Sequence, residues 1–130
     1  MLTASSATTG VSDAAPLAHT AQLVASIDGK VEPAEQAALD ALCKTVPQLK
    51  GQPLPARITR RQLLDLLGTL ESEALRRQCF VIAVEMALAS GQVNESEDQF
   101  VEMIYKSLGL ELSFATQVIQ VIACKYARGR

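Results

Sequence analysis

The sequence has little aromatic, histidine or basic character. Of its 130 residues, 4% are aromatic, none is tryptophan, one is histidine (His19), and the formal net charge is −2. So few aromatic side chains provide no stacking platform for single-stranded nucleic acid, and no net positive charge attracts phosphates. One histidine without a Cys-x-x-Cys pair supplies no zinc framework. We therefore expect no nucleic-acid partner, and we expect His19 to be a solvated side chain.

The sequence also lacks a recognisable catalytic motif. No serine lies in a G-x-S-x-G segment, and no helical Glu-x-x-His pair suggests a di-iron site. Cys43, Cys79 and Cys124 lie far apart in apolar surroundings, which predicts three reduced thiols in the core of a cytoplasmic protein. We expect a protein that is not an enzyme.

No long hydrophobic run or targeting segment is present. The longest apolar run, 79–84, is interrupted by Glu85 and resumes only to Ala89, whereas a membrane-spanning helix needs about 20 residues. Residues 1–16 lack the basic residues and apolar core of a signal peptide and are rich in Ser, Thr and Ala, which predicts a disordered N-terminal tail. Insertion into a membrane is not expected, although peripheral association stays an alternative.

What the sequence does contain is helical periodicity. Apolar residues recur at one-sided helical spacing, and no segment alternates like a strand. Helices are predicted near 17–27, 33–46, 59–70, 73–89, 95–108 and 113–127. The helix over 73–89 is apolar on nearly every side, which predicts that it is the buried centre. The predicted fold is an all-α bundle of six to seven helices in one domain, 17–130.

Start and stop signals support these bounds. Residues typical of helix starts precede or open the predicted helices: Pro33, Thr59 with Gln62, Ser72, Asn94 with Glu97, and Ser113. Residues typical of helix ends follow them: Gly29, Gly91 and Gly109.

One short pattern occurs twice. The segment 28–35, DGKVEPAE, is matched at 90–97 by SGQVNESE, in which the Gly, the Val and the final Glu coincide. Each segment lies between two predicted helices. The match predicts two helix–turn–helix units related by an approximate two-fold axis.

The first of these segments resembles the second half of an EF-hand loop, with Gly29 at its sixth position and Glu35 at its twelfth. The first and third positions are Val24 and Ser26, so an EF-hand calcium site is excluded for want of oxygen ligands. A turn that ends one helix and caps the next explains the pattern without a ligand. A different divalent-metal site is the alternative, with these candidate ligands: Asp28, Glu32, Glu35, Glu85 and Glu97.

Glu85 is the one charged residue between Arg77 and Glu95, on the most apolar helix. A buried carboxylate without a partner costs several kcal/mol. We therefore predict a pair with an Arg or Lys from another helix. A carboxylate cluster with Asp28 and Glu35 is the alternative.

Basic residues concentrate in one part of the sequence: Arg57, Arg60, Arg61, Arg76 and Arg77. Arg60 and Arg61 lie in the first turn of a predicted helix, where the helix dipole does not favour cations. They are candidates for binding an acidic partner or lipid phosphates, with a solvated surface as the alternative. Acidic residues crowd the start of the helix at 95–108, and this separation of charge suits docking or a homodimer.

The segments ASIDGKVEPAEQAALDAL and MALASGQVNESEDQFVEMIYKSLGL resemble the paired motifs of the TerB-like, tellurite-resistance family, over about residues 17–127. The resemblance implies an all-helical bundle with internal two-fold repetition, acting as a non-catalytic stress-response module of bacteria that docks a protein partner. It also implies links to membrane partners and to metal sensing through acidic positions, here Asp28, Glu32 and Glu35. Ser90 stands where the second motif has an aspartate.

Overall fold

The computed structural model describes residues 2–27, 29, 31–51, 54–89 and 95–128. All regular secondary structure in these residues is α-helical, which confirms the predicted all-α class. They form six helices: α1 (Leu2–Ala25), α2 (Pro33–Thr45), α3 (Arg60–Gly68), α4 (Glu73–Leu88), α5 (Glu95–Leu108) and α6 (Leu112–Arg128).

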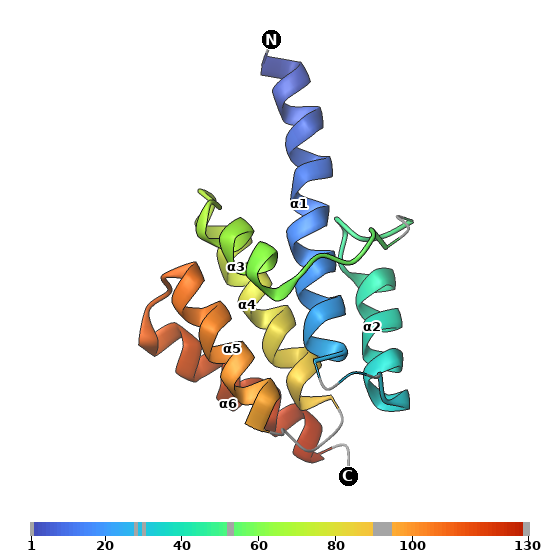
Figure 1. The fold of residues 1–130 in the computed structure, drawn as a ribbon, viewed down its shortest axis with the longest axis vertical. Helices are drawn as coiled ribbons and strands as arrows, with labels where there is room; N and C mark the ends of the chain where they lie inside the picture. Colours follow the sequence, from blue (N-terminus) through green and yellow to red (C-terminus); the bar gives the residue numbers. More distant parts are fainter. Residues whose placement is uncertain (1, 28, 30, 52–53, 90–94, 129–130) are drawn as a thin grey trace.

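The start of α1 differs most from the prediction. The helix begins at Leu2, so it includes most of the segment expected to be a disordered tail. Alanine is the strongest helix former, and extending an existing helix adds hydrogen bonds without a new nucleation cost. Pro16 lies inside the helix and has no N–H to donate, so one hydrogen bond of the helix is missing there. Figure 1 shows the first part of α1 extending beyond the other helices.

Two predicted helix starts are confirmed in atomic detail. The Gln62 N–H donates to Thr59 Oγ1 at 3.0 Å, and the Thr59 N–H donates to Gln62 Oε1 at 2.8 Å, which is a reciprocal capping box at the start of α3. The Leu75 N–H donates to Ser72 Oγ at 3.2 Å at the start of α4. These side chains replace the helical partners that the first N–H groups of a helix lack.

The predicted cap at Ser113 is wrong. The Ala115 N–H donates to the Glu111 carbonyl at 3.1 Å, so α6 begins at Leu112 and Ser113 lies inside its first turn. The predicted cap at Asn94 and the predicted stop at Gly91 lie outside the described residues.

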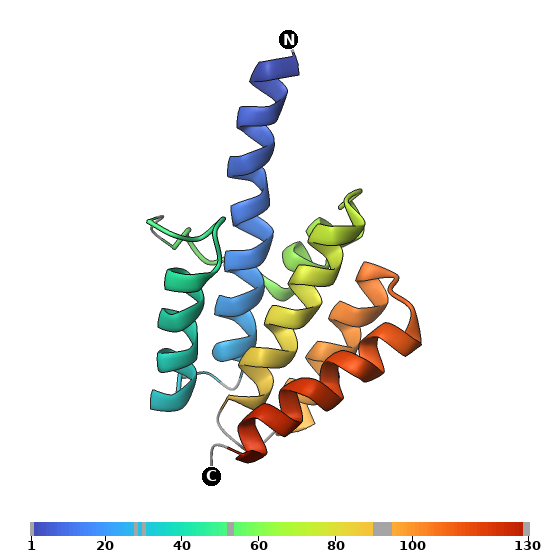
Figure 2. The same ribbon diagram turned by 180° about the vertical axis from the view of Figure 1, so that it is seen from behind.

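The most extensive contact between helices in the described residues is that of α1 with α4. Helix α4 packs against α1, α2, α5 and α6, while α3 contacts α1 and α5 (Figures 1 and 2). Eight residues of α4 are buried: Leu75, Cys79, Phe80, Ile82, Ala83, Val84, Met86 and Ala87. The Phe80 ring lies 5.9 Å from the Tyr105 ring of α5 and 6.4 Å from the Phe114 ring of α6, measured between centroids. Phe80 therefore joins three helices through one buried side chain.

Both α1 and α4 bury small residues. Ala18, Ala21 and Ala25 are buried on α1, and Cys79, Ala83 and Ala87 are buried at four-residue spacing on α4. Small side chains at a helix contact permit a short distance between the axes.

The environments of His19 and Cys124 differ from the predictions. His19 is 8% exposed rather than solvated. The nearby Gln22 side chain donates to the Pro55 carbonyl at 3.0 Å, which ties the segment before α3 to this part of α1. Burial lowers the pKa of His19, and a hydrogen bond with Gln22 opposes this more weakly. Cys79 is buried in the core as predicted, whereas Cys43 is half-buried and Cys124, on α6, is exposed.

None of the helices in the described part of the chain is long and apolar enough to cross a membrane.

Candidate functional site

The turn after α1 is stabilised by a glycine and an arginine. Gly29 adopts a φ of +98°, a left-handed conformation that favours glycine, and its N–H donates to the Ser26 carbonyl at 3.0 Å. The Arg60 guanidinium donates to the Ile27 carbonyl at 3.1 Å. Carbonyls at the end of a helix carry partial negative charge, so Arg60 lies where a cation is favoured, although it opens its own helix.

The remaining arginines of the predicted basic patch have different partners. Arg57 donates to Ser26 Oγ, near Arg60. Arg76 donates to the Leu108 carbonyl at 3.2 Å, at the end of α5. Arg77 forms an ion pair with Glu73 at 2.8 Å and lies over the Phe114 ring at 4.8 Å from its centroid. Arg61 is exposed. Arg57 and Arg60 thus contact the turn after α1, and Arg76 contacts the C-terminal end of α5.

Two of the metal-candidate carboxylates occupy equivalent positions. Glu35 and Glu97 are each the third residue of their helix, α2 and α5, and each is 2% exposed. The Glu35 Oε1 atom accepts from the Glu32 N–H at 3.0 Å, so Glu35 caps α2 as predicted. Asp28 lies outside the described residues.

Glu85 has partners on α6. Lys125 Nζ lies 2.7 Å from Glu85 Oε2, and the Tyr126 hydroxyl donates to the same oxygen. The predicted pairing with a basic residue of another helix is confirmed. Burial, followed by the hydrogen bond and the negative charge of Glu85, raises the pKa of Tyr126. We call Glu85, Lys125 and Tyr126 the α4–α6 clamp.

Within the described residues, no three His, Cys, Asp or Glu side chains are grouped as metal ligands would be. Glu85 is held by the α4–α6 clamp, and Glu35 is held by its own helix start.

We expect millimolar Ca²⁺, Mg²⁺, Mn²⁺ or Zn²⁺ to leave the melting temperature nearly unchanged. A micromolar site at millimolar metal would stabilise the native state by about 4 kcal/mol, which thermal melting detects easily. Asp28→Asn/Glu35→Gln is the matched control, since it keeps side-chain shape and removes charge. A rise of more than a few degrees in the parent protein that the double variant loses would establish a metal site.

The most distinctive surface of the protein lies around α6, and the sequence did not predict it. Four large apolar side chains are exposed on α6 and the adjoining part of α4: Val81 (36%), Leu112 (70%), Ile119 (44%) and Val121 (68%). Within the described residues, α6 packs closely against α4 alone. Its buried apolar residues are Ala115 and Ile122. The helix therefore has more apolar side chains than its packing uses, and this excess is the signal in the sequence that could have revealed the surface.

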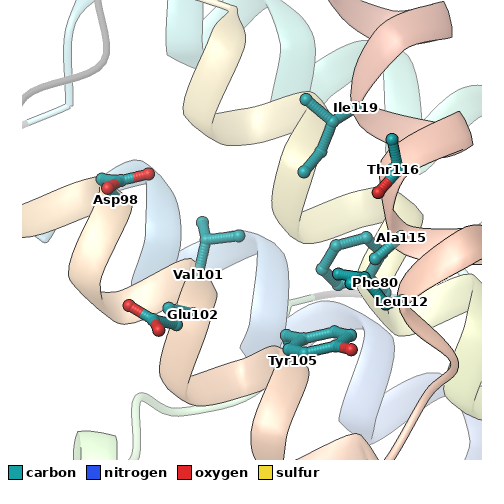
Figure 3. Close-up of a pocket in the computed structure, with 9 residues that line it drawn as sticks. All are labelled: Phe80, Asp98, Val101, Glu102, Tyr105, Leu112, Ala115, Thr116 and Ile119. Carbon is teal, nitrogen blue, oxygen red and sulfur yellow. The ribbon is translucent and has the colours of Figure 1, made fainter.

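A groove of about 340 Å³ runs between α5 and α6. We call it the α5/α6 groove, and Figure 3 shows the side chains that line it: Phe80, Asp98, Val101, Glu102, Tyr105, Leu112, Ala115, Thr116 and Ile119. Phe80 of α4 lies between the two helices, while Asp98 and Glu102 present carboxylates on the α5 side. The groove is apolar along its length with acidic groups on one edge.

A second open depression lies between α4 and α6, where Val81, Val118 and Val121 are among the lining residues. Arg77 stacks on Phe114 at this surface, and Lys125 lies beyond it along α6. On this side of α6 each of these cations is paired with a carboxylate of α4, Arg77 with Glu73 and Lys125 with Glu85.

Comparisons of the chain with models of protein families, with curated proteins and with solved structures gave no match.

Proposed function

We propose that this protein is a non-catalytic helical interaction module that docks a protein partner. The observation that carries the proposal is the apolar surface on α6, where Leu112 and Val121 are about 70% exposed. Leu112 lines the α5/α6 groove and Val121 lines the depression between α4 and α6, and exposed apolar side chains with charged residues at the edge are characteristic of protein interaction sites.

The repeat and the resemblance to the TerB-like family support a stress-response module built from two similar pairs of helices. The pairs α1–α2 and α4–α5 each consist of two successive helices, and Glu35 and Glu97 are buried at matching positions in the second helix of each pair. We infer that the two units are related by an approximate two-fold axis, with α4 as the central helix. Such a module would serve a bacterial stress response of the tellurite-resistance type, in the cytoplasm or against the membrane surface.

The test is genetic. Deleting the gene from its source organism is expected to increase sensitivity to tellurite or oxidative stress, and re-expressing the protein should restore growth. A variant with Leu112→Ser and Val121→Ser should fail to restore it while melting normally, because both side chains are exposed. Unchanged growth of the deletion strain would refute the stress-response role, and full rescue by the double variant would refute the role of this surface.

A further inference from the structure

We propose that the α5/α6 groove binds an amphipathic helix of the partner protein, with an apolar face and basic flanking residues. The proposal rests on the proposed function, because it names the surface and the kind of partner that the module uses. A helix laid in an apolar groove is a common mode of recognition in which a few side chains spaced by three, four and seven residues enter the groove.

The dimensions of the groove fit this mode. On α6, Leu112 and Ile119 are seven residues apart, which is about 10.5 Å or two turns of helix. On α5, Asp98 and Tyr105 have the same separation. Both walls therefore present side chains over two turns, so a third helix lying along them would meet contacts at its own i, i+3 or i+4, and i+7 positions.

The shape of the groove admits a helix. Ala115 and Thr116 are the small residues of the α6 wall, between Leu112 and Ile119. Small side chains in a wall permit close approach of a neighbouring helix, while the larger ones on either side contact its flanks. The Phe80 ring, 1% exposed, gives the groove a rigid apolar floor.

The negative charge along the α5 edge of the α5/α6 groove favours a basic partner. Asp98 and Glu102 line the groove, and Glu95 is exposed one turn before Asp98. Lys106 forms an exposed ion pair with Glu102 at 3.5 Å, and such a pair contributes little and exchanges readily. Lysine or arginine beside the apolar face of the partner would complement these carboxylates and increase the association rate at low salt. The same acidic edge disfavours anionic lipid surfaces.

The experiment measures binding of two synthetic helices to the full-length protein by fluorescence anisotropy. One fluorescein-labelled peptide of about 18 residues, or five turns, has leucines on one face and lysines elsewhere, and the other has glutamates in place of the lysines. We expect the Leu/Lys peptide to bind and the Leu/Glu peptide to bind at least tenfold more weakly. Binding should weaken as salt rises, because exposed charges are screened.

Variants locate the site. Ile119→Ser should weaken binding of the Leu/Lys peptide about tenfold, since it removes an apolar contact of the groove. Asp98→Asn/Glu102→Gln should weaken it and reduce its salt dependence. Met103→Ser is the matched control, because this apolar residue is 51% exposed on α5 but does not line the groove, and it should change the affinity less than twofold.

Three results would overturn the proposal: no binding of the Leu/Lys peptide, equal binding of both peptides, or equal effects of Ile119→Ser and Met103→Ser. Light scattering at high protein concentration tests a second copy of the chain as the occupant. A parent dimer that Ile119→Ser makes monomeric would assign the groove to self-association instead. If the groove fails these tests while deletion of the gene still causes stress sensitivity, the proposed function stands and the partner binds elsewhere.

Discussion

Phe80→Ala is expected to destabilise the protein by about 3–5 kcal/mol, the range for removing a buried phenylalanine. Phe80 is 1% exposed and contacts the rings of Tyr105 and Phe114, so alanine would leave a cavity where α4, α5 and α6 meet. Since domains are stabilised by only about 5–15 kcal/mol in total, this variant is expected to be partly unfolded or close to unfolding at room temperature.

Val81→Ala is the matched control for this prediction. Val81 is the next residue of the same helix but is 36% exposed, so its truncation should cost less than about 1 kcal/mol. Urea denaturation followed by circular dichroism measures both free energies. Similar losses for the two variants would contradict the position of Phe80 in the core.

Gly29→Val is expected to cost about 2 kcal/mol or more, because a β-branched residue is disfavoured at a positive φ. Apart from its two chain neighbours, no atom of the described residues lies within 4 Å of a Cβ built at Gly29, so the loss would come from backbone conformation and not from a clash. Asp28→Ala should cost much less, since an aspartate in a sequence of this type typically contributes no more than a local side-chain hydrogen bond.

Gly68→Ala is the control, and it is expected to change the stability in the opposite direction. Gly68 is the last residue of α3 and is not at positive φ, and its added Cβ would meet only the Ser107 carbonyl at 4.0 Å. Replacing a helical glycine by alanine should stabilise by about 0.5 kcal/mol. Thermal melting distinguishes these outcomes, since 1 kcal/mol shifts the midpoint of a domain of this size by several degrees. Comparable losses for Gly29→Val and Asp28→Ala would contradict the structural role of the turn.

Helix bounds were predicted well where capping residues and apolar periodicity in the helix itself determine them. The span of α5 agrees at both ends, and Thr59 and Ser72 cap the helices expected of them. The start of α1 was missed because alanine-rich sequence is compatible with either a helix or a tail, and Pro16 marked a boundary that the helix passes through. Local sequence patterns determine caps and turns. They do not determine how far a helix extends beyond the helices that pack against it.

The partners of charged residues depend on tertiary structure. Sequence reasoning identified Arg60 as misplaced relative to its own helix dipole, but its partner, the Ile27 carbonyl, is brought near by the packing of α3 on α1. The pairing of Glu85 could be predicted from the cost of burying a charge, but Lys125 as its partner could not. The exposed face of α6 was missed for the same reason, since periodicity does not show which apolar positions a neighbouring helix covers.

The α4–α6 clamp also has a consequence for the thermodynamics of binding. Helix α6 is held near its C-terminus by Lys125 and Tyr126, and its other end follows the turn at Gly109, where φ is +64° and Leu110 packs against the core. The wall that α6 gives to the α5/α6 groove is therefore fixed at both ends before any partner arrives. A preorganised wall loses little conformational entropy on association, so most of the contact energy gained in the groove would appear as affinity.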